Sequence, residues 1–140
     1  MKIYVASSWR NDYQQNVVKF LRELGHDVYD FKNPPHGKSG FAWSDIDENW
    51  LNWTSDEYKK ALEHPLAIAG YKSDKDGMDW ADCCIMVLPC GRSANTEAGF
   101  MKGEGKKVYV FTEIKQEPEL MYKLYDGIIT SYDELKNFLN

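Results

Sequence analysis

One glutamate in this sequence stands where a carboxylate can do chemistry. Glu97 lies in residues 90–99 (CGRSANTEAG), directly after the apolar run of residues 83–89. This order predicts a buried strand, a short loop and a helix, and ligands of open α/β sheets bind outside the carboxyl ends of the strands. We expect Glu97 in the first turn of that helix, where the macrodipole favours its ionised form. An ionised, oriented carboxylate in a sugar-sized crevice suits the nucleophile of a glycosyl transfer.

The loop before Glu97 is small and polar, and it enters the expected helix at its N-terminus. Backbone amides at that end of a helix bind anions and hydroxyl groups. Arg92 suits a phosphate through charge-assisted hydrogen bonds, but a surface side chain paired with an acid is an equal interpretation. A plain strand-to-helix turn with Ser93 as N-cap also stays open. The candidate substrate-binding residues of this loop are Gly91, Arg92, Ser93 and Asn95.

A group of acids precedes the apolar run: Asp74, Asp76, Asp79 and Asp82. Departure of a base from a sugar needs a proton donor near the leaving nitrogen. One of these acids suits that role if the chain folds it back over the crevice. The ordinary interpretation is a solvated acidic surface near a helix N-terminus, and the residues alone do not choose a member.

The run of residues 2–6 is β-branched and aromatic, which predicts a central strand. Tyr4 lies in its middle, and a core tyrosine is the ordinary interpretation. A buried hydroxyl needs a partner, however, and a carboxylate at the end of a neighbouring strand would serve. The residues that follow lie at the same edge of the sheet, or form a loop and N-cap before the next helix. The candidate ligand contacts among them are Ser7, Trp9 and Arg10.

The hydrophobic pattern predicts the elements that hold these residues in place. Residues 11–24 have helical periodicity and residues 26–31 form a strand pattern, which together with residues 2–6 open a βαβ unit. We expect a single α/β domain over residues 1–140, with a doubly wound five-stranded parallel sheet, helices on both faces and a flavodoxin-like (Rossmann-like) strand order. The other expected strands are 83–88, 107–111 and 127–130, and the other expected helices are 55–63, 74–81, 93–103, 117–125 and 131–139.

Residues 33–73 differ from the rest of the chain because they combine prolines and glycines with many aromatic residues. A long irregular segment of this kind is usually functional or disordered, and its tryptophans argue against disorder. Trp43, Trp50 and Trp53 have two interpretations of equal weight, as core residues or as a stacking lid over a planar base. Pro65 is expected to end the helix that starts near residue 55.

The composition is that of one soluble domain, since the chain has 140 residues, 43% of them hydrophobic and 28% charged. A net charge of −5 argues against duplex nucleic acid as a partner, but not against a small phosphorylated ligand. No apolar stretch is long enough to span a bilayer, and the N-terminus lacks the features of a signal peptide. We therefore expect no membrane partner.

The cysteines and histidines predict neither a disulfide nor a metal site. Cys83 and Cys84 lie in an expected buried strand and act as small hydrophobic residues, and Cys90 makes the count odd without a CxxC motif. The histidines have no ligand spacing with them. We expect no metal, no cofactor, and a reduced, cytoplasmic setting.

Three blocks of the sequence resemble one known family. Residues 2–7 resemble its first strand, with its tyrosine in place. Residues 74–82 resemble its Asp-x-x-x-apolar-x-x-Ala-Asp block, which selects Asp74 from the acidic group, and residues 89–99 resemble its catalytic Glu-x-Gly segment. The family is that of the nucleoside 2-deoxyribosyltransferases, with the related deoxynucleoside 5′-monophosphate N-glycosidases. The blocks follow in order over most of the chain, while residues 33–73 align with nothing in it.

The resemblance implies a role for each matched residue. Glu97 would attack C1′ of a deoxyribosyl group to form a glycosyl ester, Asp74 would assist departure of the base, and Tyr4 would orient Glu97. Ser93 and the neighbouring amides would hold the 5′ end of a small-molecule nucleoside or nucleotide. The resemblance also implies a homodimer or higher homo-oligomer in which a neighbouring subunit completes the site. No partner residue is assigned, because residues 127–140 are not clearly matched.

Several functional alternatives stay open at this point. Water or a free base can release the sugar from the ester, which separates a hydrolase from a transferase. A glycohydrolase or cyclase of an NAD-type dinucleotide would use a catalytic glutamate on the same kind of sheet, and residues 33–73 would help to build its second nucleotide pocket. A non-catalytic nucleotide-binding module would keep the fold and bind its ligand even after Glu97→Ala. The base preference, the 5′-phosphate requirement and the tolerance of a 2′-hydroxyl are not determined by the residues.

Overall fold

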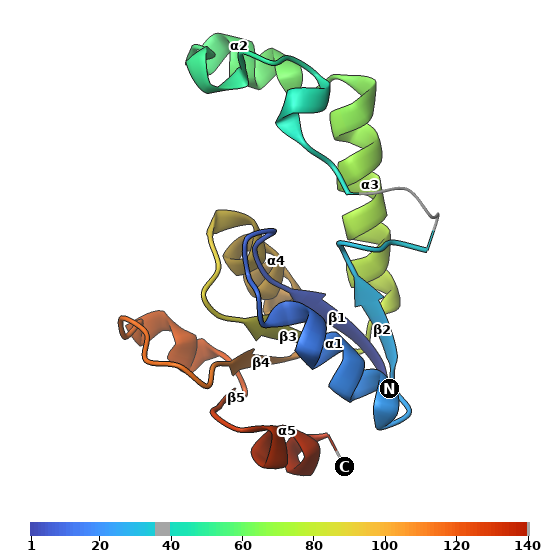
Figure 1. The fold of residues 1–140 in the computed structure, drawn as a ribbon, viewed down its shortest axis with the longest axis vertical. Helices are drawn as coiled ribbons and strands as arrows, with labels where there is room; N and C mark the ends of the chain where they lie inside the picture. The colour runs from blue at the N-terminus through green and yellow to red at the C-terminus, as the bar shows by residue number, and fades with distance from the viewer. Residues whose placement is uncertain (36–39, 140) are drawn as a thin grey trace.

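The centre of the molecule is a parallel sheet, seen in a computed structural model that describes residues 1–35 and 40–139 (Figure 1). Its strands are β1 (Lys2–Ala6), β2 (Asp27–Asp30), β3 (Cys83–Val87), β4 (Lys107–Phe111) and β5 (Gly127–Ile129). They lie in the order β2-β1-β3-β4-β5, and every neighbouring pair is parallel. The five-stranded, flavodoxin-like order predicted from the sequence is therefore confirmed.

The helices are α1 (Gln14–Glu23), α2 (Ser55–Ala61), α3 (Pro65–Trp80), α4 (Arg92–Gly103) and α5 (Tyr132–Phe138), with the 3-10 turns η1 (Trp43–Asp45), η2 (Trp50–Asn52) and η3 (Leu120–Leu124). The sheet has one hydrophobic cluster on each face. α1 and α5 pack on one face, and α3 and α4 pack on the other. Helices cover both faces, as expected. Within the described part of the chain, none of the helices is both long enough and apolar enough to cross a bilayer.

The side chains of β1 alternate between the two faces of the sheet. Ile3 and Val5 pack with α1 and α5, whereas Tyr4 and Ala6 pack with α3 and α4. Such a strand is covered on both sides, as is typical of parallel sheets. The alternation directs Tyr4 toward the helices that carry the candidate acids.

The third helix is longer than predicted. Residues 65–80 form one continuous helix, whereas the sequence pattern predicted a helix only over 74–81. The helix that starts at residue 55 ends before Pro65, as predicted. Pro65 is the first residue of α3, where a missing backbone N–H costs no hydrogen bond. The His64 side chain caps this end by accepting a hydrogen bond of 3.1 Å from the amide of Leu66. Asp74 therefore lies in the middle of a helix and not near its start.

The helix predicted over 117–125 is only the short turn η3. The side chain of Glu119 accepts from the amide of Met121 and starts the turn, and Tyr125 leaves it in an extended conformation. Residues three apart are eclipsed in a 3-10 turn. That geometry stacks the rings of Tyr122 and Tyr125 with centroids 5.8 Å apart.

Residues 40–72 form an arm that stands away from the sheet and contains η1, η2, α2 and the first half of α3 (Figure 1). Its rings pack on one another: Trp43 makes edge-to-face contacts with Phe41, Trp53 and Tyr58. Trp53 also donates a hydrogen bond of 2.8 Å to Asp47. Of the two interpretations of the tryptophans, the contacts of Trp43 and Trp53 favour a core, here the core of the arm.

Candidate active site

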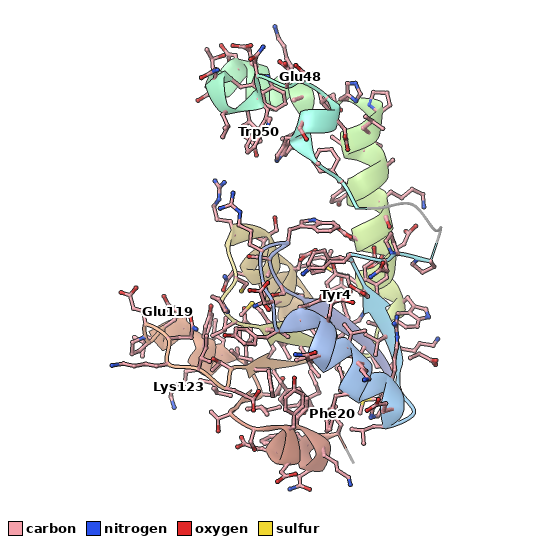
Figure 2. The ribbon with its side chains drawn as sticks, in the orientation of Figure 1. Tyr4, Phe20, Glu48, Trp50, Glu119 and Lys123 are labelled. Carbon is pink, nitrogen blue, oxygen red and sulfur yellow. The ribbon has the colours of Figure 1, made fainter. Side chains whose placement is uncertain are left out.

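The side chains of Tyr4 and Glu97 meet on the side of the sheet that α3 and α4 cover. The Tyr4 hydroxyl donates a hydrogen bond of 2.5 Å to Oε2 of Glu97. Tyr4 is fully buried, in the interior of the molecule (Figure 2). α4 places the small buried residues Ala94 and Ala98 against the sheet, so that the helix approaches β1 closely. The sheet thus brings together the two residues that were predicted to be neighbours.

Burial sets the ionisation of Glu97. It raises the pKa of the Glu97 carboxyl to about 7, against the lowering effect of the Tyr4 hydrogen bond and with a further rise from the charge of Asp74. α4 begins at Arg92, so Glu97 lies in the second turn and not in the predicted first turn. The dipole effect fades beyond the first turn. The expectation of a carboxylate held ionised by the macrodipole is therefore wrong, and near neutral pH much of Glu97 is protonated.

A second pair of tyrosine and carboxylate lies beside the first. The Tyr29 hydroxyl donates a hydrogen bond of 2.9 Å to Oδ1 of Asp74, and it also lies 2.9 Å from Oγ of Ser73. Tyr29 is the register partner of Tyr4 on the neighbouring strand. Their rings stack with centroids 5.1 Å apart and planes 6° from parallel. Asp74 and Glu97 are therefore each bound by one of two stacked tyrosines.

The other three acids of the group have structural partners. Their contacts are Asp76 with Lys72 at 2.6 Å, Asp79 with Lys75 at 2.7 Å, and Asp82 with the backbone amide of Lys2 at 3.0 Å. Asp74 is thus the member of the group that the fold places beside Tyr4 and Glu97. Its role in departure of a base stays a prediction.

Two of the predicted ligand contacts, Ser7 and Asn95, hold the loops around the site. The buried Ser7 hydroxyl donates to the carbonyl of Val87 at 2.8 Å and so joins the ends of β1 and β3. Asn95 donates to the carbonyl of Gly91 at 2.8 Å and accepts at 2.8 Å from the hydroxyl of Tyr122. These bonds shape the loop before Glu97, and direct contact of either residue with a ligand stays a prediction.

The start of α4 differs from the predicted turn. Gly91 is the N-cap and has no side-chain cap, so Ser93 lies inside the first turn and is not the N-cap. The amide of Gly91 donates to Oγ of Ser8 at 3.0 Å. Arg92 and Ser93 are exposed at this end of the helix, where the first backbone amides have no acceptor within the helix. Binding of an anion or a hydroxyl group at this end of the helix stays a prediction.

Trp9 and Arg10 lie on the surface beyond β1. Trp9 is half exposed and makes an edge-to-face contact with Phe31 at 5.4 Å. A side chain at Gly40 would collide with the Trp9 ring, which therefore packs on the backbone where the arm begins. Arg10 is exposed. The contact of these two residues with a ligand stays a prediction.

Sequence reasoning missed a buried polar network at the carboxyl end of β2. Asp30 is 1% exposed and accepts hydrogen bonds from Gln14, Gln15 and Asn33, each of 2.9 Å. The donors come from α1 and from the turn after the strand, and no spacing rule connects them. Tyr29 was missed as well, although it lies on the same face as Tyr4 in the neighbouring strand, which is a signal the sequence carries.

A cavity of about 620 Å³ lies along the outer edge of β2, between that strand and α3. Its walls include Arg22, Tyr29, Gly77 and Trp80, but neither Glu97 nor Asp74 lines it. It therefore lies beside the tyrosine pair and is separate from the face that Glu97 and Asp74 present.

The described residues offer no cluster of three histidine, cysteine or acidic side chains arranged around a cation site. All three cysteines are unpaired thiols; Cys83 and Cys84 are buried and Cys90 is half-buried. Burial, and then the charge of Glu97, raises the pKa of the Cys90 thiol to about 11. Cys90 therefore stays protonated near neutral pH and is a poor nucleophile.

The fold recurs in two enzymes of known structure. No family model and no characterised protein sequence matches this chain. The 2-deoxyribosyltransferase of Bacillus psychrosaccharolyticus superposes with a TM-score of 0.63 at 20% identity, over 98% of this chain and 91% of that one. The CMP N-glycosidase BcmB of Clostridium botulinum superposes with a TM-score of 0.53 at 16% identity, over 99% of this chain and 98% of that one. At these identities the likeness shows a shared fold over nearly the whole chain.

Proposed function

We propose that this protein is an enzyme that cleaves or transfers at the N-glycosidic bond of a deoxynucleoside or a deoxynucleoside 5′-monophosphate, through a covalent glycosyl intermediate on Glu97. The observation that carries this proposal is the Tyr4–Glu97 hydrogen bond of 2.5 Å beside Asp74. The shared fold supports it, because a 2-deoxyribosyltransferase and a CMP N-glycosidase have the same architecture.

In the first step, Oε1 of ionised Glu97 attacks C1′ of the sugar. Tyr4 donates to Oε2, so it orients the carboxylate and leaves the other oxygen for the attack. The bond between C1′ and the base nitrogen breaks, and its electron pair passes to the base. Asp74 assists this departure in its protonated form, which donates a hydrogen bond or the proton itself to the base nitrogen and becomes a carboxylate. The products of the step are a free base and a glycosyl ester of Glu97.

In the second step, an acceptor releases the sugar from Glu97. A lone pair of water or of a second base forms the new bond to C1′ while the ester bond between C1′ and Glu97 breaks. The acceptor loses a proton, and the Glu97 carboxylate is regenerated. Two displacements at C1′ retain the configuration of the sugar. Water gives a hydrolase and a base gives a transferase, by the same residues.

The raised pKa of Glu97 suits a nucleophile of this kind. A carboxylate that is hard to ionise is also more basic, and it loses less hydration when it attacks in a buried site. With a pKa of about 7, ionised Glu97 is present in quantity near neutral pH. Attack therefore depends on pH in the range where the group titrates.

The start of α4 supports a site for the 5′ end of the substrate. Exposed first-turn amides and the hydroxyl of Ser93 suit hydroxyl or phosphate oxygens. The Arg92 side chain forms no ion pair with an acid among the described residues. Of its two interpretations, a phosphate contact is therefore the better supported one.

We also propose a homo-oligomer, because the chain leaves large apolar side chains exposed in two places. One is the arm, and the other is η3, where Glu119 and Lys123 project outward at the rim (Figure 2). Large exposed apolar side chains that gather in one segment are typical of interaction sites. A second copy that covers them would bury this apolar surface. The exposed residues are Leu51, Tyr58, Leu62, Leu66, Ile68 and Tyr71 on the arm, and Leu120, Met121 and Leu124 on η3.

Product analysis tests the proposed reaction. The protein is incubated with deoxynucleosides and with their 5′-monophosphates, with and without free adenine or cytosine, and the products are separated by chromatography. We expect release or exchange of base by the native protein and by Glu104→Gln, an exposed glutamate at the end of the same helix. Glu97→Gln should be inactive. Base release by Glu97→Gln at the native rate would overturn the mechanism.

Mass spectrometry tests the intermediate separately. A 2′-fluoro substrate analogue slows release of the sugar, so the ester accumulates on the protein. We expect an adduct that peptide mapping places on Glu97. An adduct on another residue would overturn the assignment of the nucleophile, while base release would still support the proposed reaction.

A further inference from the structure

We infer that Tyr29 is a positioning residue of this site, whose hydroxyl orients Asp74 and whose ring holds Tyr4 against Glu97. The inference rests on the proposed function. It concerns a residue outside the sequence blocks that suggested Glu97, Asp74 and Tyr4, and it explains how the fold keeps two carboxylates oriented in one place.

The hydrogen bonds of Tyr29 have a defined direction. Its hydroxyl has one proton and lies 2.9 Å from both Oδ1 of Asp74 and Oγ of Ser73. The proton points to Oδ1 of Asp74, which accepts it, so Ser73 donates to the tyrosine oxygen. A chain of donors then runs from Ser73 through Tyr29 to Asp74. Such a chain polarises each bond and fixes the carboxylate more firmly than one bond alone.

The ring of Tyr29 limits the movement of Tyr4. Tyr29 is 5% exposed, and its ring lies parallel to that of Tyr4 at a centroid distance of 5.1 Å. The ring also packs on α3, where a Cβ at Gly77 would come within 2.8 Å of it. The same helix therefore carries Asp74 and, about one turn later, the glycine that admits the ring. Tyr4 cannot swing away from Glu97 on this side unless Tyr29 moves as well.

This arrangement couples the two carboxylates. The charge of Asp74 is one of the causes that raise the pKa of Glu97. The Tyr29 hydroxyl holds Asp74 by a hydrogen bond of 2.9 Å and so fixes the position from which that charge acts on Glu97. Loss of the hydroxyl therefore changes the field of Asp74 at Glu97, and the titration midpoint of Glu97 moves.

Two variants with matched controls test the inference. Tyr29→Phe removes the hydroxyl and keeps the stacked ring, and Gly77→Ala displaces the ring without changing a polar group. Tyr132→Phe alters a ring in the cluster on the opposite face of the sheet, and Gly103→Ala adds a Cβ with no atom within 4 Å. For each protein, carboxyl NMR follows the titration of Glu97, and steady-state kinetics give kcat and KM.

We expect Tyr29→Phe to shift the titration midpoint of Glu97 and to reduce kcat by about tenfold or more, with little change in KM. Gly77→Ala should reduce kcat in the same way, although alanine favours a helix, and both controls should behave as the native protein. An unchanged midpoint in Tyr29→Phe overturns the inference, whatever the turnover. A shifted midpoint with native kcat overturns the positioning role of Tyr29 in the reaction. If the native protein turns over no substrate, the proposed function fails, and the midpoint alone decides whether Tyr29 controls the carboxylate pair.

Discussion

The Tyr4 hydroxyl donates to Oε2 of Glu97 across 2.5 Å and so ties β1 to the second turn of α4. The residues lie 93 positions apart, and they meet because β1 and β3 are parallel neighbours and the chain passes from β3 into α4. Burial and the nearby acids raise the pKa of Tyr4 far above its usual value. Tyr4 therefore stays a neutral donor. Its hydrogen bond lowers the pKa of Glu97, which burial raises.

Tyr4→Phe should shift the pH dependence of the reaction. The variant removes the hydrogen bond that lowers the pKa of Glu97 and leaves burial and the charge of Asp74 to raise it. We expect the acid limb of the pH–kcat profile to move to higher pH, and kcat near neutral pH to fall by about tenfold or more. Base release measured across the pH range checks this, with Tyr132→Phe as the control. An acid limb at its native position would contradict the role of Tyr4.

Glu97→Gln should stabilise the protein at alkaline pH. The pKa of Glu97 is raised from 4.5 to about 7 on folding, so its contribution to stability is present below the lower value and is lost as pH rises through the higher one. A neutral amide avoids the cost of burying a charge. Near pH 8 we expect a gain of about 1–3 kcal/mol in the free energy of unfolding, and near pH 5 little or none.

Urea unfolding of Glu97→Gln and the native protein at both pH values measures this difference. Glu104→Gln is the matched control, because Glu104 is exposed at the end of α4. Its stability relative to the native protein should not depend on pH. A Glu97→Gln gain of equal size at both pH values would show that burial does not control the ionisation of Glu97.

The contact between Tyr4 and Glu97 was predictable because it depends on two features of the sequence. These are the alternation of side chains along a strand and the order of strands and helices along the chain. Alternation along β1 fixes the face of Tyr4, and a strand followed by a loop and a helix fixes the edge where Glu97 lies. Selection of Asp74 from its acidic group came from a motif resemblance. The same alternation places Tyr29 beside Tyr4, but only once the register of two strands separated by a helix is known.

Other features depend on packing that the sequence pattern does not express. Pro65 breaks a helix in most interior positions, yet here it starts one, because His64 caps the first turn. The position of Glu97 in the second turn followed from an N-cap at Gly91 in place of Ser93. The two-residue difference at the start of α4 moves Glu97 out of the first turn, so that burial and not the helix dipole controls its ionisation.

Asp30→Asn should destabilise the fold without touching the candidate site. Burial raises the pKa of Asp30, but the hydrogen bonds from Asn33, Gln15 and Gln14 outweigh it and lower that pKa below its usual value. The side-chain NH₂ of an asparagine at this position would face the N–H donors that now bind the carboxylate. We expect a loss of about 2–4 kcal/mol in the free energy of unfolding near neutral pH. The effect is expected in thermal or urea unfolding, with base release by the folded variant unchanged.

The pH dependence of the Asp30→Asn effect gives a second measurement. Because the folded-state pKa of Asp30 is lowered, its charge stabilises the protein at pH values above the unfolded-state pKa near 3.8. This contribution to stability is lost as pH falls through the folded-state pKa. The difference in stability between the native protein and Asp30→Asn should therefore shrink in acid. A constant difference down to low pH would show that the charge of Asp30 is not what the network stabilises.

The proposed homo-oligomer predicts a particle larger than the 16.3 kDa of one chain. Ile68→Glu on the arm and Leu120→Glu on η3 place charges on surfaces that a second copy would bury, so each should reduce the mass measured by light scattering and lower base release in parallel. Lys19→Glu changes an exposed charge on α1, outside the arm and η3, and it should leave both unchanged. A native protein that is fully active as a monomer would show that one chain completes the Glu97 site alone.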